Sequence, residues 1–259
     1  MKKIISILIL ALSAITTTQA ATLAERADSA YTADNFQQAA MLYSKAAETD
    51  GTSSALFYNL GNTHYRMGQL GKAILYYERA LKLDPANEDA RANLAFVNSR
   101  IIDQPGDRGS VMSKIVDDTS SAAHSNTWSW ISVGCFALML GSIAVYIFSE
   151  NVTLRKISFF GGLALLALTI VGVIMAVIAA GKATSTERAV IIAPSTQLST
   201  SPRQPKDKTE QAILLHEGTV VEIIDSVATP ADTVNPMWLD VRIDNINRAW
   251  VSKSDIERI

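Results

Sequence analysis

Cysteine and histidine are scarce in this chain, and the residue patterns that enzymes use at their active sites are missing. Cys135 is the only cysteine among 259 residues, which excludes a disulfide within the chain, a zinc site of several cysteines and a lipid-modified cysteine at the N-terminus. The three histidines, His64, His124 and His216, lie far apart, with no recurrent carboxylate at acid–base or metal-ligand spacing. The sequence has neither a Gly-rich phosphate loop nor a Gly-x-Ser-x-Gly elbow. We therefore expect a protein that is not an enzyme and that holds no cofactor or metal.

A large excess of charge of one sign is also missing. The formal net charge is −2 and the sequence has no block of basic residues, which argues against a nucleic-acid partner. Two long stretches, residues 127–148 and 157–181, carry no charge at all, and each exceeds the roughly 20 apolar residues with which a helix crosses a bilayer. We predict a transmembrane hairpin with a loop at residues 149–156. The alternative, a helical hairpin buried in a globular core, would need a much larger protein around it.

The orientation of the hairpin is predicted from its loop and from the N-terminus. Arg155 and Lys156 lie side by side in the loop, and short cytoplasmic loops are enriched in such residues. Residues 1–20 have the layout of a secretory signal peptide, with basic residues before an apolar run and a cleavage site expected after Ala20. Both features place the loop inside the cell and the two flanking parts outside. The charge-free runs contain no ionisable group of the kind that marks a transport path.

Residues 21–104 are expected to form helical repeats. The stretch 54–87 matches the 34-residue tetratricopeptide pattern, in which small residues lie where two helices cross, large ones fill the core and a proline follows the second helix. The matching positions are Phe57, Leu60, Gly61, Tyr65, Ala73, Tyr77, Ala80 and Pro85. One period earlier, Ala27, Tyr31, Ala39 and Tyr43 occupy the equivalent positions. We predict two repeats followed by a capping helix over residues 87–102.

An array of two and a half repeats is short, because about three are usually needed for stability. It should therefore lean on another part of this protein or on a partner. The residues expected on its concave, partner-binding side are Asp28, Tyr31, Asn62, Tyr65, Arg66 and Phe96. Asn62 together with Arg66 would hold a peptide backbone or a carboxylate. The alternative is a solvated helix face with the tyrosines packed between helices. His64 replaces the tyrosine common at its position, and we interpret it as a packing substitution.

The last part of the chain is predicted to be β-structure. Residues 105–126 form a linker with proline, glycine, serine and threonine, and the hairpin follows it. In residues 182–259 the pattern changes to short β-branched runs separated by turn residues. The predicted strands are 188–192, 212–215, 220–225, 238–243 and 249–251. Five short strands favour a small barrel, with Trp238 and Trp250 partly buried and available as contacts for a ligand.

Segments of this last part resemble a bacterial SH3-like domain. They are residues 216–220 (His-Glu-Gly-Thr-Val), 238–241 (Trp-Leu-Asp-Val) and 248–251 (Arg-Ala-Trp-Val). With the signal segment, the repeats and the hairpin before it, the whole chain resembles the BatE-like proteins of the Bacteroides aerotolerance (Bat) operon. The fold implied is multidomain: an α-helical tetratricopeptide array, a transmembrane helical hairpin and a small SH3-like β-barrel.

What the resemblance implies is a non-enzymatic adaptor in the bacterial inner membrane, with both the array and the barrel in the periplasm. Its implied partners are membrane proteins with von Willebrand type A domains and a MoxR-like ATPase, in a complex related to aerotolerance or stress. Two alternatives from the residues stay open. The barrel could sense the cell wall by binding peptidoglycan through Trp238 or Trp250, or it could pack against the repeats and support them.

Overall fold

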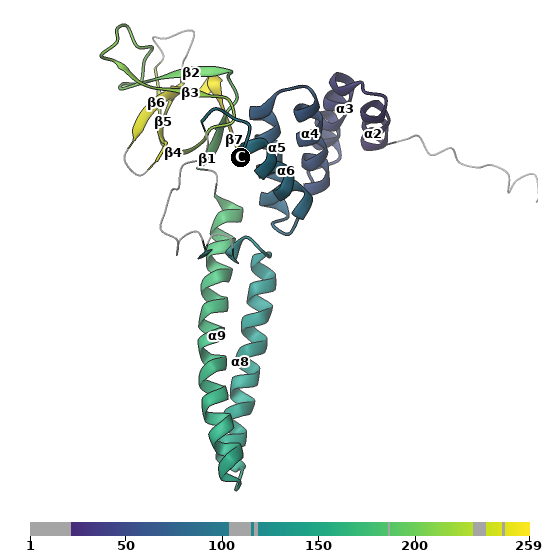
Figure 1. The fold of residues 1–259 in the computed structure, drawn as a ribbon, viewed down its shortest axis with the longest axis vertical. Helices are drawn as coiled ribbons and strands as arrows, with labels where there is room; N and C mark the ends of the chain where they lie inside the picture. Colours follow the sequence, from purple (N-terminus) through teal and green to yellow (C-terminus); the bar gives the residue numbers. More distant parts are fainter. Residues whose placement is uncertain (1–21, 104–114, 117–118, 186, 230–236, 245–246) are drawn as a thin grey trace, which may run out of the picture.

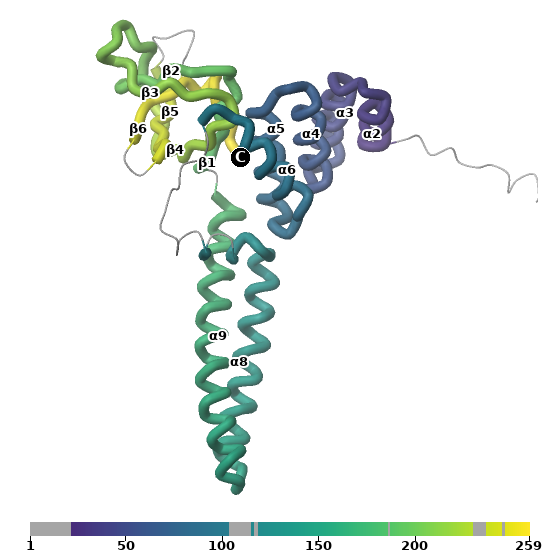
Figure 2. The backbone as a smooth tube through the Cα atoms, in the orientation of Figure 1, coloured from purple at the N-terminus to yellow at the C-terminus, as the bar shows by residue number. Residues whose placement is uncertain are grey.

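The computed structural model describes residues 22–103, 115–116, 119–185, 187–229, 237–244 and 247–259. It consists of a helical array, a long helical hairpin and a β-sheet (Figure 1). The array and the sheet lie side by side at the same end of the hairpin (Figure 2). The signal segment predicted at residues 1–20 and more than half of the predicted linker, residues 105–114 and 117–118, lie outside the described residues.

Five helices form the array, and polar residues at their N-termini set where most of them begin. Ser53 and Asn87 accept hydrogen bonds from the first-turn N–H groups of Leu56 and Ala90, and Thr22 forms a capping box with Glu25. These contacts satisfy backbone donors that have no partner inside a helix. The helices are α2 (Leu23–Thr32), α3 (Phe36–Thr49), α4 (Ser54–Arg66), α5 (Leu70–Leu83) and α6 (Glu88–Asn98).

The core of the array follows the predicted repeat pattern. Gly61 lies against the ring of Tyr77, and a Cβ on that glycine would stand 2.6 Å from two ring carbons. Leu60, Ala73, Tyr77 and Ala80 are buried. Helix α5 ends at Leu83, two residues before Pro85. The positions singled out by the 34-residue pattern therefore do the packing expected of them, and the capping helix is confirmed as α6.

Helices α8 (Ser125–Phe148) and α9 (Val152–Thr184) form the predicted hairpin, and both are long and apolar enough to cross a membrane. Only 11% of the most apolar window of each helix is buried, so most of that apolar surface is not covered by the described parts of the protein. The two helices approach closely where Gly172 of α9 faces Ser132 of α8. One boundary differs from the prediction. The side chain of Asn151 caps α9, so the helix begins at Val152. Arg155 and Lys156 therefore lie in the first turns of α9 and not in a loop.

Seven antiparallel strands form one sheet in the order β3-β2-β6-β5-β4-β1-β7. The strands are β1 (Arg188–Ile191), β2 (Ser195–Ser199), β3 (Gln211–His216), β4 (Val220–Ala228), β5 (Met237–Arg242), β6 (Arg248–Ser252) and β7 (Ile256–Arg258). The sequence prediction missed β2, which is mostly polar, and β7, which has three residues and follows a short 3-10 turn. The sheet is open, with β3 and β7 at its edges, so closure into a small SH3-like barrel is not confirmed.

The sheet packs directly on helix α5. Val190 of β1 belongs to the same buried apolar cluster as Ile74 and Val97 of the array. Gly71 lets the two parts approach, because a Cβ there would stand 2.7 Å from the carbonyl oxygen of Ile191. On the other side of this contact Gly218, with a φ of +89°, faces the side chains of Ile74 and Ile101. One apolar core thus crosses the boundary between helices and strands.

Ion pairs and hydrogen bonds surround this apolar contact. Glu78 of α5 pairs with Arg188 of β1 through two contacts of 2.9 and 3.1 Å. Arg79 pairs with Glu257 at 3.0 Å. Beyond the end of α6, Asp103 accepts hydrogen bonds from the backbone N–H of His216 at 2.6 Å and from the Thr219 hydroxyl at 2.9 Å. The short array therefore leans on another part of its own chain, which is one of the alternatives that the sequence left open.

Replacing Gly71 by alanine tests this contact. Alanine favours a helix over glycine by about 1 kcal/mol, yet the added methyl group meets a backbone carbonyl that cannot move aside alone. We expect G71A to lower the free energy of unfolding by about 1–3 kcal/mol, the usual cost of overpacking, measured by thermal unfolding of the solubilised full chain. The matched control is G141A, because a Cβ at Gly141 meets nothing within 4 Å. Equal melting temperatures of G71A and G141A would show that α5 and β1 do not approach closely at Gly71.

Candidate partner-binding face of the repeat array

Two predicted concave residues, Asp28 and Asn62, lie at equivalent positions of the two repeats. Each accepts a hydrogen bond from the tyrosine of the second helix of its own repeat: Tyr43 donates to Asp28 Oδ1, and Tyr77 donates to Asn62 Oδ1 at 2.7 Å. Burial raises the pKa of both tyrosines above its usual range, so both remain donors at neutral pH.

Each acceptor also receives a hydrogen bond from the helix that follows its repeat, which is α4 for the first repeat and the capping helix α6 for the second. Asn59 Nδ2 donates to Asp28 Oδ1 at 3.5 Å, and Asn93 Nδ2 donates to Asn62 Oδ1 at 2.9 Å. The same three-residue network therefore occurs twice, one period apart, and joins neighbouring helical units. Asn62 Oδ1 thus accepts two hydrogen bonds within the array, and the joint role of Asn62 and Arg66 around a peptide or carboxylate stays a prediction.

Arg66 packs on aromatic residues of the first repeat. Its guanidinium lies 4.4 Å from the ring centroid of Phe36 and 5.9 Å from that of Tyr31, and it pairs with Asp34 at 2.9 Å. Tyr31, Phe36 and Arg66 form what we call the first arginine–aromatic cluster. The sequence analysis missed Asp34 and Phe36 as neighbours of Arg66, because they lie 32 and 30 positions before it in the sequence.

A second arginine–aromatic cluster consists of Tyr65, Phe96 and Arg100. The Arg100 guanidinium lies 4.0 Å from the ring centroid of Phe96 and donates to the Tyr65 hydroxyl at 2.8 Å. Phe96 is 46% exposed although it is a large apolar residue. Within the described residues Arg100 pairs with no carboxylate, in contrast to Arg66. The signal that could have revealed Arg100 was its position, one repeat period after Arg66.

Comparison with known proteins bears on one part of the array. The family model described as tetratricopeptide repeat matches residues 54–87, which cover α4 and α5. These two helices are a tetratricopeptide repeat. The match spans a small part of the chain, and no curated protein matches the sequence. Tetratricopeptide arrays present concave surfaces to other proteins, so the array suggests protein–protein interaction or scaffolding.

The sheet offers less to a ligand than the sequence suggested. Trp238 is 2% exposed, so its ring has no free face for stacking, and its predicted role as a contact is corrected. Its indole nitrogen is buried without a hydrogen-bond partner among the described residues. Trp250, on β6, is half-buried and remains the aromatic candidate of this part.

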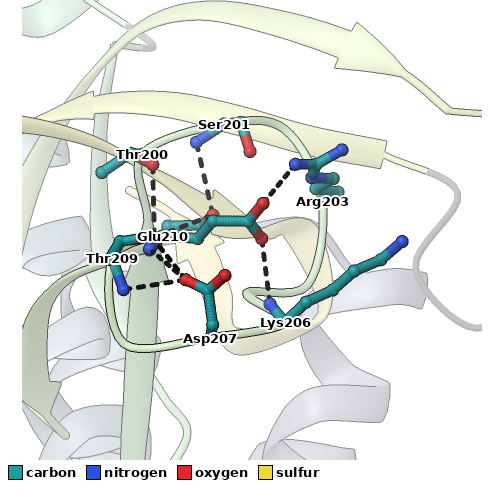
Figure 3. Close-up of polar contacts among 8 residues, drawn as sticks. Thr200, Ser201, Arg203, Lys206, Asp207, Thr209 and Glu210 are labelled. Atoms are coloured by element: carbon teal, nitrogen blue, oxygen red, sulfur yellow. Dashed lines mark hydrogen bonds and ion pairs between the residues drawn. The ribbon is translucent and has the colours of Figure 1, made fainter.

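The loop between β2 and β3 holds itself in place (Figure 3). Glu210 pairs with Arg203 and accepts a hydrogen bond from the backbone N–H of Lys206 at 2.9 Å. Asp207 accepts from the backbone N–H and the hydroxyl of Thr209 at 2.9 and 2.5 Å. These hydrogen bonds lower the pKa of both carboxyl groups. The two carboxylates therefore order the loop and are occupied within it.

The three histidines lie apart in the structure as well. His64 is buried, stacks on Tyr76 with ring centroids 5.1 Å apart and contacts Gln69 at 2.7 Å, so it packs in the tetratricopeptide array as predicted. Burial lowers its pKa. His124 contacts Asp84 at 3.1 Å and His216 contacts Asp103 at 3.2 Å. The sequence analysis missed both carboxylates because folding brings them from distant positions. Among the described residues no group of three potential ligands could hold a metal.

Substitutions at Asn62 test the repeated network. Asn62→Leu removes the acceptor of the Tyr77 hydroxyl and should lower the free energy of unfolding by about 1–3 kcal/mol, the cost of a buried unsatisfied donor. Asn62→Asp keeps the acceptor, as Asp28 does in the first repeat, and should melt close to the wild type. Thermal unfolding of the solubilised chain measures both. If the two variants lose the same stability, the carbonyl oxygen does not hold the repeats together.

The hydrogen bonds that Asp103 accepts should make stability depend on pH. Burial opposes the ionisation of Asp103. Its pKa is nevertheless below the usual value, because the carboxylate accepts hydrogen bonds from the backbone N–H and the imidazole of His216 and from the Thr219 hydroxyl. A lowered pKa contributes stability above the unfolded-state value, and this contribution is lost as the pH falls through the folded-state value. The wild type should melt above D103N at neutral pH and should lose that advantage below about pH 4, the ordinary range for aspartate. A difference in melting temperature that is independent of pH would contradict this.

Proposed function

We propose that the protein is a membrane-anchored adaptor whose tetratricopeptide array binds a protein partner through the second arginine–aromatic cluster. The observation that carries this proposal is the exposure of Phe96 and Arg100 on the last helical unit of the array. The sheet covers α5 but leaves these side chains in solvent. An exposed aromatic ring next to an arginine is typical of the residues that dominate binding energy in protein interfaces.

The chemistry of this cluster favours an acidic or carbonyl-rich segment of the partner. Stacking on Phe96 and the hydrogen bond to Tyr65 orient the Arg100 guanidinium. A guanidinium has five N–H donors, so several remain to bind a partner carboxylate in two parallel hydrogen bonds. The first cluster differs, because Asp34 already pairs with Arg66. Binding should therefore depend more on the second cluster than on the first.

The hairpin supplies the proposed anchor. We place the Arg155 and Lys156 end of the hairpin in the cytoplasm, and the array and the sheet in the periplasm of a bacterial inner membrane. The contact between α5 and the sheet supports an array and a sheet that move together as one unit at the end of the hairpin. Resemblance to the Bat proteins makes membrane proteins with von Willebrand type A domains and a MoxR-like ATPase complex the proposed partners.

The alternative that the sheet binds the cell wall depends on a single tryptophan. With Trp238 buried, peptidoglycan would have to stack on Trp250, which is half-buried on β6. The adaptor hypothesis is supported by two exposed neighbouring side chains, Phe96 and Arg100, and we favour it for that reason.

Affinity purification with a double variant tests the adaptor proposal. The full chain is purified from its native membranes in detergent, and the co-eluting proteins are compared between the wild type and F96A/R100A. The control is M41A/K45A, which also removes one exposed apolar and one basic side chain four positions apart, on α3. We expect F96A/R100A to lose about tenfold or more of a partner that M41A/K45A retains, as for removal of a binding hot spot.

Two results would count against this proposal. Identical sets of co-eluting proteins from the two double variants would remove the cluster from the binding face. A partner that is lost from both double variants would indicate that the substitutions destabilise the array in general. Thermal melting of F96A/R100A at the wild-type temperature would show that loss of the partner does not come from unfolding.

A further inference from the structure

A cavity lies at the junction of the array, the sheet and the hairpin. It has a volume of about 670 Å³ and is lined by residues of α5, the last turns of α9, residues 120–121 and the beginning of β1. Cavities of this size hold small molecules or parts of larger ligands. Neither arginine–aromatic cluster contributes to it, so the cavity is separate from the proposed partner-binding face.

With the hairpin in a bilayer, as proposed above, the cavity would lie at the membrane surface. The uncharged run of α9 ends at Gly181, and Gly181 and Ala179 both line the cavity. Lys182 follows at once and donates hydrogen bonds to the hydroxyls of Ser120 and Ser121 at 2.8 and 2.9 Å. Lysines at such a boundary lie at the level of lipid headgroups. Ala179 is buried, whereas Gly181 is exposed, so the cavity adjoins the exposed apolar surface of α9 at Gly181.

The charged side chains that line the cavity are mostly basic. Among the described lining residues, Lys82, Arg91, Lys182 and Arg188 carry positive charge, and Glu78 and Glu187 carry negative charge. Arg188 and Glu78 neutralise each other through their double contact.

The remaining contacts of two of these cations are to main-chain oxygens. Lys82 donates to the main-chain oxygen atoms of Ser185 and Ile259 at 2.5 and 3.0 Å. Arg91 donates to the carbonyl oxygens of Pro85 and Ser121. Such contacts hold the ammonium and guanidinium groups in place, and each group retains further N–H donors for an anion.

We propose that this cavity binds the phosphate headgroup of an anionic membrane lipid, with Lys82 and Arg91 as the principal donors. Arginine and lysine are the usual phosphate-binding side chains, and the bidentate geometry of arginine suits a phosphodiester. A free phosphate ion would meet the same donors. The exposed end of the uncharged run at Gly181 favours the lipid, because acyl chains can continue from there along the exposed apolar residues of α9. A lipid bound here would contact both α5 and α9 and would link the array to the membrane surface.

Lipid binding to the full chain in detergent tests the proposal. Native mass spectrometry measures the affinity for phosphatidylglycerol, with phosphatidylcholine and inorganic phosphate as separate arms. We expect K82Q/R91Q to bind phosphatidylglycerol about tenfold or more weakly than the wild type, because two charge-assisted hydrogen bonds are lost. The matched control is R26Q/K45Q, which removes two exposed cations from α2 and α3. It should bind as the wild type does.

A second variant keeps the proposal testable if K82Q/R91Q disturbs the fold. Ser121→Asp leaves Lys82 and Arg91 unchanged but adds a carboxylate to the cavity wall, and it should weaken phosphatidylglycerol binding by a similar factor. Its control is Ser29→Asp on the exposed face of α2.

Three results would overturn the proposal. The first is equal binding of phosphatidylglycerol by the wild type, K82Q/R91Q and S121D. The second is competition by inorganic phosphate as effective as that by phosphatidylglycerol, which would assign the site to a soluble anion. The third is equal affinity for phosphatidylcholine, which would show that the cations contribute nothing. None of these results depends on whether the array binds a protein partner.

Discussion

Close contact between helix α5 and strand β1 is the constraint on which the arrangement of this protein depends. Two helical repeats, of which residues 54–87 are a tetratricopeptide repeat, and a capping helix bury little surface by themselves, and one face of α5 would otherwise remain in water. The sheet covers that face through Val190, and Gly71 permits the approach because it has no side chain. Since the hairpin separates the two parts in the sequence, this contact also requires both of them to lie at the same end of the hairpin (Figure 2).

The contact also determines which surfaces remain for other molecules. Asp28 Oδ1 and Asn62 Oδ1 accept hydrogen bonds between helical units, so these two acceptors on the predicted concave side are already used. Arg100 and Phe96 lie beyond the second repeat, and both are exposed among the residues that the structure describes. The second arginine–aromatic cluster therefore keeps two of its three side chains in solvent.

The sequence predicted those features that depend on neighbouring residues or on a regular period. Gly61, Ala73 and Tyr77 were assigned correctly because one repeat contains its own helix crossing. Strand β2 was missed because its polar residues show no strand pattern, and its pairing with β3 and β6 decides its conformation. Trp238 was expected to be available to a ligand, but whether an alternating strand residue faces water or the core depends on what packs on that side of the sheet.

By itself the sequence determined the tetratricopeptide unit and the two apolar helices, since a 34-residue period and an uncharged run of bilayer length are properties of contiguous segments. Tertiary structure alone decided that the sheet is open, that it packs on α5, and that Asp103 meets His216. It also decided that Lys82, Arg91 and the end of α9 enclose one cavity. The physical reason is that these contacts join residues about 90 to 150 positions apart, and no local propensity records which distant surfaces fit together.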